Sequence, residues 1–500
     1  MGASEPANAS GTVRFVLDGK LVSASGLPPT LTVLEYLRNV AGLSDTKEGC
    51  AEGDCGACTV VLGELAEDGV SIQYRPINSC IRFLPTLDGK ELVTAGSLKA
   101  RDGSLHPVQQ AMVDEHASQC GFCTPGFVMS LFALYLQQDA PDRAAVTEAL
   151  SGNLCRCTGY RPIIDAGCRM VRYAPPAHWS RADSQSAERV DALRALARVR
   201  SHGAALEVAG FRAPRSLDEL ASALVAAPDS LVLAGGTDVG LWVTKLLREL
   251  PPIVYVGEVA ELRQIRSTER GLWIGAAVTL SAAWPALLAA HPELAEQGKR
   301  FASPPIRNSA TLVGNLANGS PIGDSIPALI ALGAELELRK GRRTRRLALE
   351  HFYLGYQKKD LAPGELVVAV VVPAAQAGRK LASYKVSKRI EQDISAVCAT
   401  FAVVVQGGVV TDARLAFGGM AAIPARARHA EAALMGQPWS AESIDAAGAA
   451  LAQDFEPLTD LRASAAYRSR VAGNLLRRFY LEQLLHGEPL RLAAVHGAAT

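Results

Sequence analysis

Eight of the ten cysteines in this 500-residue chain fall into two groups of four, and the two groups have different spacings. In the first group, Cys50, Cys55 and Cys58 lie within the run GCAEGDCGAC, and Cys80 follows after a stretch with strand character. The pattern C-x4-C-x2-C…C is typical of four thiolates that hold a [2Fe–2S] cluster. We therefore expect a cluster loop at the rim of a small N-terminal sheet.

The second group has the pattern C-x2-C…C-x-C. Cys120 and Cys123 form CGFC, and Cys155 and Cys157 form CRC. Two four-thiolate sites in series on one chain predict a path for single electrons. Zinc remains an alternative at this second group, because paired short cysteine spacings are also typical of zinc sites.

Glycines favour a cluster over a disulfide framework at the first group. Gly49, Gly53 and Gly56 alternate with the cysteines, where a sharply bent backbone brings its N–H groups close to sulfur. The N-terminal run MGASEPANASGT has neither the basic start nor the apolar core of a secretory signal, so we expect a cytoplasmic protein without disulfides. Cys168 and Cys398 are expected to be small buried hydrophobic residues.

The composition predicts a soluble globular protein. Hydrophobic residues make up 49% and charged residues 20% of the chain, and the net charge is +1, so neither nucleic acid nor an anionic membrane is an expected partner. No apolar run approaches the ~18–20 residues of a membrane span. The apolar run from Phe127 to Leu136 predicts a buried helix, and the basic run from Arg339 to Arg346 predicts a solvated hairpin turn.

Periodicity predicts several domains in series. Residues 11–95 are strand-rich, 96–175 helical, 176–205 a partly helical linker, 206–380 of mixed α+β character, and 381–490 a sheet backed by helices.

Local signals place some of the expected elements more closely. The pair Asp18–Gly19 predicts a β-hairpin. Pro125 predicts a helix start, and Asp142 predicts an N-cap.

Two glycine-bearing turns are candidates for a nucleotide site. No G-x-G-x-x-G follows a strand and no G-x-x-x-x-G-K-[ST] is present, so neither a Rossmann site nor a P-loop is expected. The turns are AGGTD at 234–238 and SATLVGN at 309–315, where free N–H groups and hydroxyls can hold a pyrophosphate. Ordinary strand–helix turns remain an alternative reading of both.

Long motifs resemble the molybdenum hydroxylases. CAEGDCGACTV, HPVQQAMVDEHASQCGFCTPGFVMSL and GNLCRCTGYRPI are similar to the paired [2Fe–2S] domains of that family. LAGGTDVG, FASPPIRNSATLVGNLANGSPIGDSIP and YKVSKRIEQDISAVCATFAV are similar to its FAD domain. The resemblance covers nearly the whole chain. Within the family, the chain resembles the small subunit of bacterial xanthine dehydrogenases, which carries the iron–sulfur clusters and FAD. It implies a ferredoxin-like β-grasp domain, a helical-bundle cluster domain, a non-Rossmann α+β FAD domain and a C-terminal α/β sandwich-like domain.

The resemblance also implies site residues. It implies that the eight cysteines of the two groups are the cluster ligands. It implies these FAD contacts: Val232, Leu233, Ala234, Gly235, Gly236, Thr237, Asp238, Val239, Phe301, Ala310, Thr311, Leu312, Val313, Gly314, Asn315, Asp324, Leu366 and Lys385. Among them, Gly235 and Gly236 would lie at the pyrophosphate, and Phe301 would be the aromatic contact, although a plain core role remains open for it.

The function implied by the resemblance is electron transfer within a larger enzyme. Molybdopterin would lie on a large partner subunit, in an (αβ)2 heterotetramer. Electrons would pass through the cluster of the second cysteine group (the second tetrad), then through the cluster of the first group (the first tetrad), and then through FAD to NAD+. No catalytic residue is expected on this chain. Xanthine oxidation is the leading hypothesis. Oxidation of an aldehyde, an aromatic CoA thioester or a heterocycle is the alternative within the family, and a zinc-stabilised scaffold is the alternative outside it.

Overall fold

The computed structural model describes residues 11–174, 176, 178–180, 187–202, 205–390 and 392–484, and the chain divides into two compact units. The first unit comprises the chain up to Ser216 with Asp229–Glu258 and Ser303–Ala310. The second unit comprises Leu217–Pro228, Val259–Ala302 and the chain from Thr311 onward. The predicted domain boundaries stay predictions.

The first unit begins with a five-stranded mixed sheet. Its order is β2 (Lys20–Ser25), β1 (Thr12–Leu17), β5 (Glu91–Val93), β3 (Thr59–Leu65) and β4 (Ile72–Asn78). β1 runs parallel to β5 and the other pairs are antiparallel. Asp18 and Gly19 both have positive φ values, 50° and 77°, as the two-residue turn between β1 and β2 requires, so the predicted hairpin is confirmed.

One short helix lies beside this sheet. α1 (Val33–Glu35) begins at Thr32, whose side chain accepts a hydrogen bond from the Glu35 backbone N–H, and it continues into a π-helical turn over Tyr36–Val40. Val33, Leu34 and Leu37 are buried, so the apolar face of this segment packs into the domain core.

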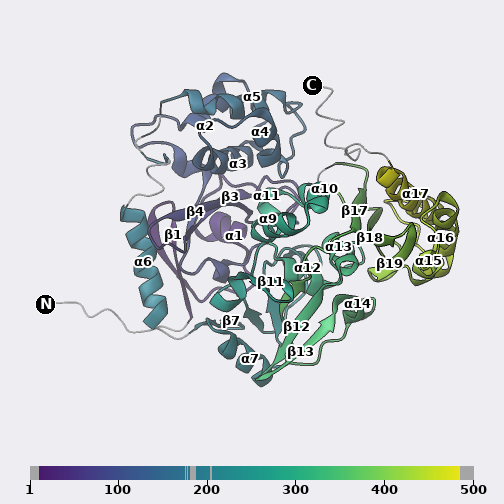
Figure 1. The fold of residues 1–500 in the computed structure, drawn as a ribbon. Coiled ribbons are helices and arrows are strands. Elements are labelled where there is room, and N and C mark those ends of the chain that lie inside the picture. The colour runs from purple at the N-terminus through teal and green to yellow at the C-terminus, as the bar shows by residue number, and fades with distance from the viewer. Residues whose placement is uncertain are drawn as a thin grey trace. The chain divides into compact units, whose positions relative to one another are not determined.

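Helices follow the sheet, as predicted. They are α2 (Pro107–Asp114), α3 (Thr124–Gln137), α4 (Arg143–Leu150) and α5 (Arg161–Arg169), which Figure 1 shows as one group. α3 is buried from Gly126 to Tyr135, which confirms the predicted buried helix. The Asp142 side chain accepts a hydrogen bond from the Ala145 backbone N–H at 2.7 Å, which confirms the predicted N-cap.

The region predicted as a partly helical linker contains α6 (Ala187–His202). Val190, Leu193 and Leu196 are buried within the same apolar cluster as α3. Their spacing of three places them on one side of the helix, so α6 is anchored to the first unit by a hydrophobic stripe.

A second, four-stranded sheet completes the first unit. Its order is β6 (Leu206–Val208), β7 (Phe211–Ala213), β9 (Ile253–Tyr255) and β8 (Leu231–Leu233). α8 (Val239–Thr244) follows β8, and α11 (Pro304–Arg307) is the last helix of the unit. The segment from Leu231 to Thr244 is thus a strand, a glycine-bearing turn and a short helix.

The second unit holds a five-stranded antiparallel sheet. Its order is β10 (Ile265–Thr268), β11 (Gly271–Gly275), β16 (Leu366–Val372), β12 (Glu335–Lys340) and β13 (Arg343–Ala348). The associated elements are α7 (Leu217–Ala226), α9 (Leu280–Ala290), α10 (Ala295–Arg300), α12 (Leu312–Asn318), α13 (Ser325–Leu332), α14 (Leu349–Phe352) and the hairpin β14 (Tyr353–Gly355) to β15 (Lys358–Lys359).

The turn predicted for the basic run from Arg339 to Arg346 is confirmed only in part. Lys340 pairs with Arg343, so the turn is limited to Gly341 and Arg342. The other basic residues lie in β12 and β13, because two antiparallel strands extend the ladder up to a two-residue turn.

The C-terminal part of the second unit is a sheet backed by helices, as predicted. β17 (Arg379–Val386), β18 (Val397–Gln406), β19 (Val409–Gly418) and β20 (Ala425–Arg426) form the sheet in this order. α15 (Arg428–Leu434), α16 (Ala441–Asp454) and α17 (Ala465–Leu484) lie beside it in Figure 1. Phe401, Phe417 and Phe479 are fully buried where the sheet and helices meet. Within the described residues, no helix has both the length and the apolar character to cross a membrane.

Candidate cluster and flavin sites

The first cysteine tetrad converges in the structure. Cys50 and Cys55 lie in the loop before β3, Cys58 directly precedes β3, and Cys80 follows β4. The thiols contact one another: a hydrogen bond from Cys55 and one from Cys80 lower the pKa of Cys50, and contacts with Cys50 and Cys58 raise the pKa of Cys80. Because the strands β3 and β4 are paired, they hold Cys58 and Cys80 side by side at one end of the sheet.

Backbone N–H groups of the loop point at sulfur. Glu52 N and Cys55 N donate to Cys50 Sγ at 3.5 Å and 3.3 Å. At Gly49, an added Cβ would lie 2.7 Å from Cys55 Sγ, so only glycine leaves room for the sulfur. Four converging thiols with N–H donors fit the requirements of a [2Fe–2S] cluster.

The second tetrad lies at helix ends. Cys123 is the N-cap residue of α3, while Cys155 and Cys157 lie between α4 and α5. Side-chain hydrogen bonds connect Cys123 with Cys155 and Cys120 with Cys157, and Thr158 Oγ1 donates to Cys155 Sγ at 3.2 Å. Burial, and then the Cys155 thiol, raise the pKa of Cys123 to about 12.

The two tetrads differ in exposure. Cys58 and Cys80 are buried, whereas Cys120 and Cys157 are exposed. Large exposed apolar side chains stand beside the second tetrad: Phe122, Leu154 and Tyr160. All ten cysteines are free, and among the described residues no three or more His, Cys, Asp or Glu side chains are arranged as ligands of a single metal ion.

Asn153 connects the two cysteine loops, and no sequence pattern marks it as a site residue. Its Nδ2 donates to Gly56 O at 3.1 Å, and its Oδ1 accepts from Ser130 Oγ at 2.6 Å. The next residue, Leu154, donates its backbone N–H to Cys55 O at 2.9 Å. Asn153 is 3% exposed, so a buried amide fixes the loop of one tetrad against the loop of the other.

The first of the two glycine-bearing turns, residues 234–238, is the candidate for the first flavin turn, and it lies in the first unit between β8 and α8. An added Cβ at Gly235 would lie 2.1 Å from Ser309 O, and Gly236 has a φ of 73°, so the turn requires glycine at both positions. The Ser309 hydroxyl is buried and has no hydrogen-bond partner in the described part of the chain. A close backbone approach beside an unpartnered buried hydroxyl fits a cradle for a phosphate group.

The helix α8, which follows this turn, packs beside the first tetrad. Ile81 is the residue after Cys80. Its carbonyl oxygen lies 2.4 Å from the position that an added Cβ on Gly240 would take. Leu241 packs against the apolar cluster that includes Cys58 and Cys80. The helix that follows the first flavin turn therefore packs directly on the cysteine loop.

The second glycine-bearing turn, residues 309–315, is the candidate for the second flavin turn, and its residues from Thr311 onward belong to the second unit. Thr311 is the N-cap of α12, and its Oγ1 accepts from Gly314 N at 3.0 Å. Asn315 Oδ1 accepts from Ser325 Oγ at 2.5 Å. Leu312 and Val313 are buried, so the turn is anchored in the apolar interior on its protein side.

Asp324 and Lys385 are brought together. Lys385 Nζ lies 2.7 Å from Asp324 Oδ2, with side-chain exposures of 4% and 6%. Ser395 Oγ donates to Asp324 Oδ1 at 2.6 Å. The two polar contacts predicted separately for FAD are thus one buried ion pair.

Two further predicted FAD contacts, Phe301 and Leu366, lie in apolar surroundings of the second unit. Phe301 packs on Trp284 at 5.8 Å between ring centroids, and Leu366 is buried in β16. Their contact with FAD stays a prediction.

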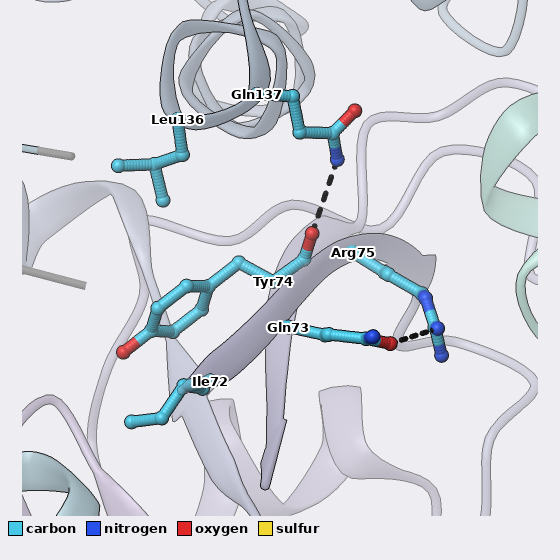
Figure 2. Close-up of a pocket in the computed structure, with 6 residues that line it drawn as sticks. All are labelled: Ile72, Gln73, Tyr74, Arg75, Leu136 and Gln137. Atoms are coloured by element: carbon cyan, nitrogen blue, oxygen red, sulfur yellow. Dashed lines mark hydrogen bonds between the residues drawn. The ribbon is translucent and has the colours of Figure 1, made fainter. Parts of the chain in front are cut away.

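A separate pocket of about 380 Å³ lies between β4 and the end of α3 (Figure 2). Gln137 crosses it and donates to Tyr74 O at 3.1 Å, which satisfies an outward carbonyl of the edge strand β4. None of the predicted site residues lines this pocket.

Four family models match the chain in series. They are a 2Fe-2S iron-sulfur cluster binding domain over 15–83, a [2Fe-2S] binding domain over 94–168, the FAD binding domain in molybdopterin dehydrogenase over 206–375, and the CO dehydrogenase flavoprotein C-terminal domain over 382–483. Each cysteine tetrad falls within one of the two cluster domains. The chain belongs to the molybdenum hydroxylase family.

Similar proteins include long xanthine dehydrogenases. The chain is 32% identical to xanthine dehydrogenase of Emericella nidulans, over 95% of this chain and 39% of that protein. It is 30% identical to xanthine dehydrogenase/oxidase of Gallus gallus, over 88% of this chain and 38% of that protein. The chain thus spans about two fifths of the length of these molybdenum hydroxylases.

Similar solved structures include chains of carbon monoxide dehydrogenases. For the enzyme of Hydrogenophaga pseudoflava the TM-score is 0.50 at 32% identity, over 54% of this chain and 94% of that one. For the enzyme of Oligotropha carboxidovorans the TM-score is 0.50 at 29% identity, over the same shares of the two chains. The iron–sulfur and flavin domains of the molybdenum hydroxylase family are therefore present on this chain.

Proposed function

We propose that this chain is the electron-transfer subunit of a xanthine dehydrogenase. Its partner would be a large subunit that carries molybdopterin and oxidises hypoxanthine and xanthine to urate, in a cytoplasmic (αβ)2 heterotetramer. The two cysteine tetrads would hold [2Fe–2S] clusters, which supply one-electron transfer, and the two glycine-bearing turns would hold FAD, which can take up electrons singly and pass a pair to NAD+ as a hydride. In this proposal the chain binds the cofactors, sets the distances between them and tunes their reduction potentials. It needs no acid–base residue.

The observation that carries the proposal is the order of contacts within the first unit. The exposed thiols of Cys120 and Cys157 lie beside exposed apolar side chains, which favours this surface as the one that meets a partner. Asn153 then connects the second tetrad with the loop of the first. Ile81 in turn connects the first tetrad with the helix after the first flavin turn. Such a series supports electron delivery from a partner to the flavin.

The xanthine assignment rests on similarity. The xanthine dehydrogenases align with 82–95% of this chain, which supports the same activity. The carbon monoxide dehydrogenase neighbours support a second candidate, the equivalent subunit of a different molybdenum hydroxylase, because the substrate would bind the partner subunit.

The test is purification of the intact complex from its source. We expect a red-brown protein with flavin absorption bands, a co-purifying large molybdenum subunit, and NADH formation with xanthine. Aldehydes and heterocycles in the same assay decide between the two candidates. A colourless chain that contains zinc, or a lone chain that oxidises xanthine unaided, would contradict the proposal.

A further inference from the structure

The end of α8 meets the loop of the first tetrad at two successive carbonyl groups. Thr244 Oγ1 lies 2.6 Å from Ala51 O, and Lys245 Nζ lies 3.0 Å from Cys50 O. These contacts join residues 193 and 195 positions apart in the chain. The helix that follows the first flavin turn therefore also holds the cysteine loop.

The peptide unit between Ala51 and Glu52 is bonded on both sides. Its carbonyl oxygen accepts from Thr244, and its N–H donates to Cys50 Sγ at 3.5 Å. Because the trans peptide unit is planar and its C=O and N–H point in opposite directions, the contact that orients one group also orients the other. A hydrogen bond to the carbonyl oxygen polarises the amide and strengthens donation by its N–H.

The backbone at this point needs external support. Ala51 has a φ of 55°, in the left-handed region that a residue with a Cβ seldom adopts. Such a conformation persists only where the surroundings hold it. The hydroxyl of Thr244 and the ammonium of Lys245 bind the carbonyls on either side of the Ala51 Cα, and so provide that support.

We propose that Thr244 and Lys245 are positioning residues that raise the reduction potential of the first cluster. They do so by holding the Ala51–Glu52 N–H toward Cys50 Sγ. The inference rests on the proposed function, because it requires a [2Fe–2S] cluster at the first tetrad. Hydrogen bonds to the sulfur atoms favour the more negative, reduced form, so loss of this orientation lowers the potential. Lys245 adds a positive charge, which Glu52 at 3.8 Å partly offsets.

The test is a redox titration of the holoenzyme, followed by electron paramagnetic resonance. Thr244→Val removes the hydroxyl and keeps the shape of the side chain, whereas Thr244→Ser keeps the hydroxyl. We expect the midpoint of the first cluster to shift to lower potential in Thr244→Val and to stay near wild type in Thr244→Ser. The second cluster should keep its midpoint in both. Lys245→Gln should also shift only the first midpoint downward.

Thr147→Val is the matched control, because Thr147 Oγ1 donates to Arg143 O within α4 at 2.8 Å. It should move neither midpoint. An unchanged first midpoint in Thr244→Val, or equal shifts of both clusters, overturns the inference. If Thr244→Val does not retain the cluster, the Lys245→Gln titration decides in the same way. A wild-type enzyme without two [2Fe–2S] signals would contradict the proposed function instead, so the two failures are distinguishable.

Discussion

At the scale of single residues, Asp324 and Lys385 form an ion pair in the interior of the second unit. Both charges lie almost fully out of water, and each has further partners: Ser395 donates to the carboxylate, and Lys385 Nζ also lies 3.3 Å from Arg300 O. Buried charges are tolerated only when they are paired and hydrogen-bonded. The pair therefore stabilises the native state only as long as it is intact.

Asp324→Asn should destabilise the protein by about 3 kcal/mol, because it leaves the Lys385 ammonium buried without a counter-charge. The measurement is the midpoint of thermal unfolding, expected to fall by roughly 6 °C or more. The double variant Asp324→Asn/Lys385→Met should lose less than Asp324→Asn alone, since no unpaired charge remains. Equal losses in the single and double variants would show that the ion pair is not the cause.

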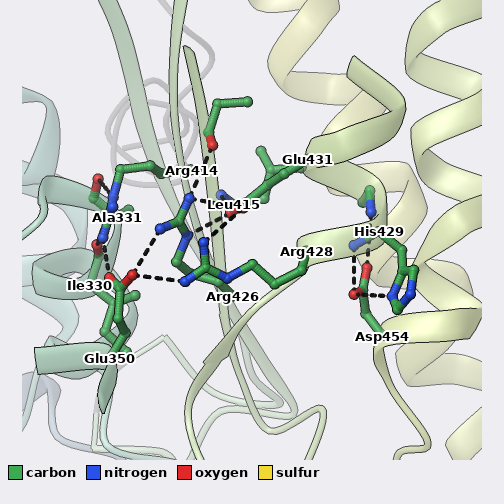
Figure 3. A network of polar contacts seen from close by, with 12 residues as sticks. Ile330, Ala331, Glu350, Arg414, Leu415, Arg426, Arg428, His429, Glu431 and Asp454 are labelled. Carbon is green, nitrogen blue, oxygen red and sulfur yellow. Dashed lines mark hydrogen bonds and ion pairs between the residues drawn. The ribbon is translucent and has the colours of Figure 1, made fainter. Parts of the chain in front are cut away.

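At the scale of elements, Glu350 connects α14 to the C-terminal sheet and α15 (Figure 3). Its carboxylate accepts from Arg426 and Arg428 at 2.8 Å and 2.9 Å, and it also contacts Arg414. Burial alone would raise the pKa of Glu350, but the hydrogen bond from Arg426 and the charges of Arg414 and Arg426 outweigh burial and lower the pKa. Three guanidinium groups from separate elements thus converge on one carboxylate.

This network predicts a pH-dependent stability. A carboxylate whose pKa is lower in the folded state stabilises above its unfolded pKa, near 4.5, and this stabilisation is lost as pH falls below that value. Glu350→Gln should cost about 3 kcal/mol at pH 7, and the difference from wild type should shrink below pH 4.5. The measurement is thermal unfolding between pH 7 and pH 3.5, with Glu456→Gln at an exposed position as the control. A difference that stays constant with pH would contradict the role of the Glu350 charge.

The helix α8 carries a glycine that its packing requires. At Gly240 an added Cβ would stand 2.4 Å from Ile81 O, closer than a methyl group and a carbonyl oxygen can approach. Gly240→Ala should therefore push α8 away from the first tetrad, lower the unfolding midpoint and reduce the iron retained per chain. Iron content and thermal unfolding are the measurements.

Gly473→Ala is the matched control, because Gly473 lies within α17 and, among the described residues, nothing beyond its chain neighbours and its own helix backbone lies within 4 Å of an added Cβ. It should stabilise the protein by about 0.5–1 kcal/mol through helix propensity alone. If Gly240→Ala behaved like Gly473→Ala, the close packing of α8 on Ile81 would be wrong.

At the scale of the whole molecule, four family domains follow one another on one chain, and the proposed function uses them in series. Cys120→Ala should abolish or destabilise the second cluster, because a [2Fe–2S] core needs four ligands. Xanthine-to-NAD+ turnover should collapse, while FAD stays bound and NADH oxidation by an artificial dye survives. Cys168→Ala, outside both tetrads, should leave both reactions intact. Xanthine-to-NAD+ turnover near wild type in Cys120→Ala would show that the serial path is wrong.

The sequence alone determined what depends on short spacings. The cysteine patterns, the Asp18–Gly19 hairpin, the Asp142 cap and the buried helix α3 each involve residues a few positions apart. Their conformations follow from local geometry and from apolar periodicity, so one sequence suffices to predict them. The basic run shows the limit even of local patterns, since its charges fit the exposed sides of two strands as well as a loop.

Only the tertiary structure decided which distant polar groups meet. Asn153 bonds to Gly56, 97 positions away, and Thr244 bonds to Ala51, 193 positions away. Asp324 and Lys385, predicted as two separate contacts, form one pair across 61 positions. Threonine, asparagine, aspartate and lysine are common on any surface, and no local pattern marks the few that become buried partners. Their roles arise because packing of the apolar core brings their segments together and places polar partners from distant parts of the chain within reach of each group.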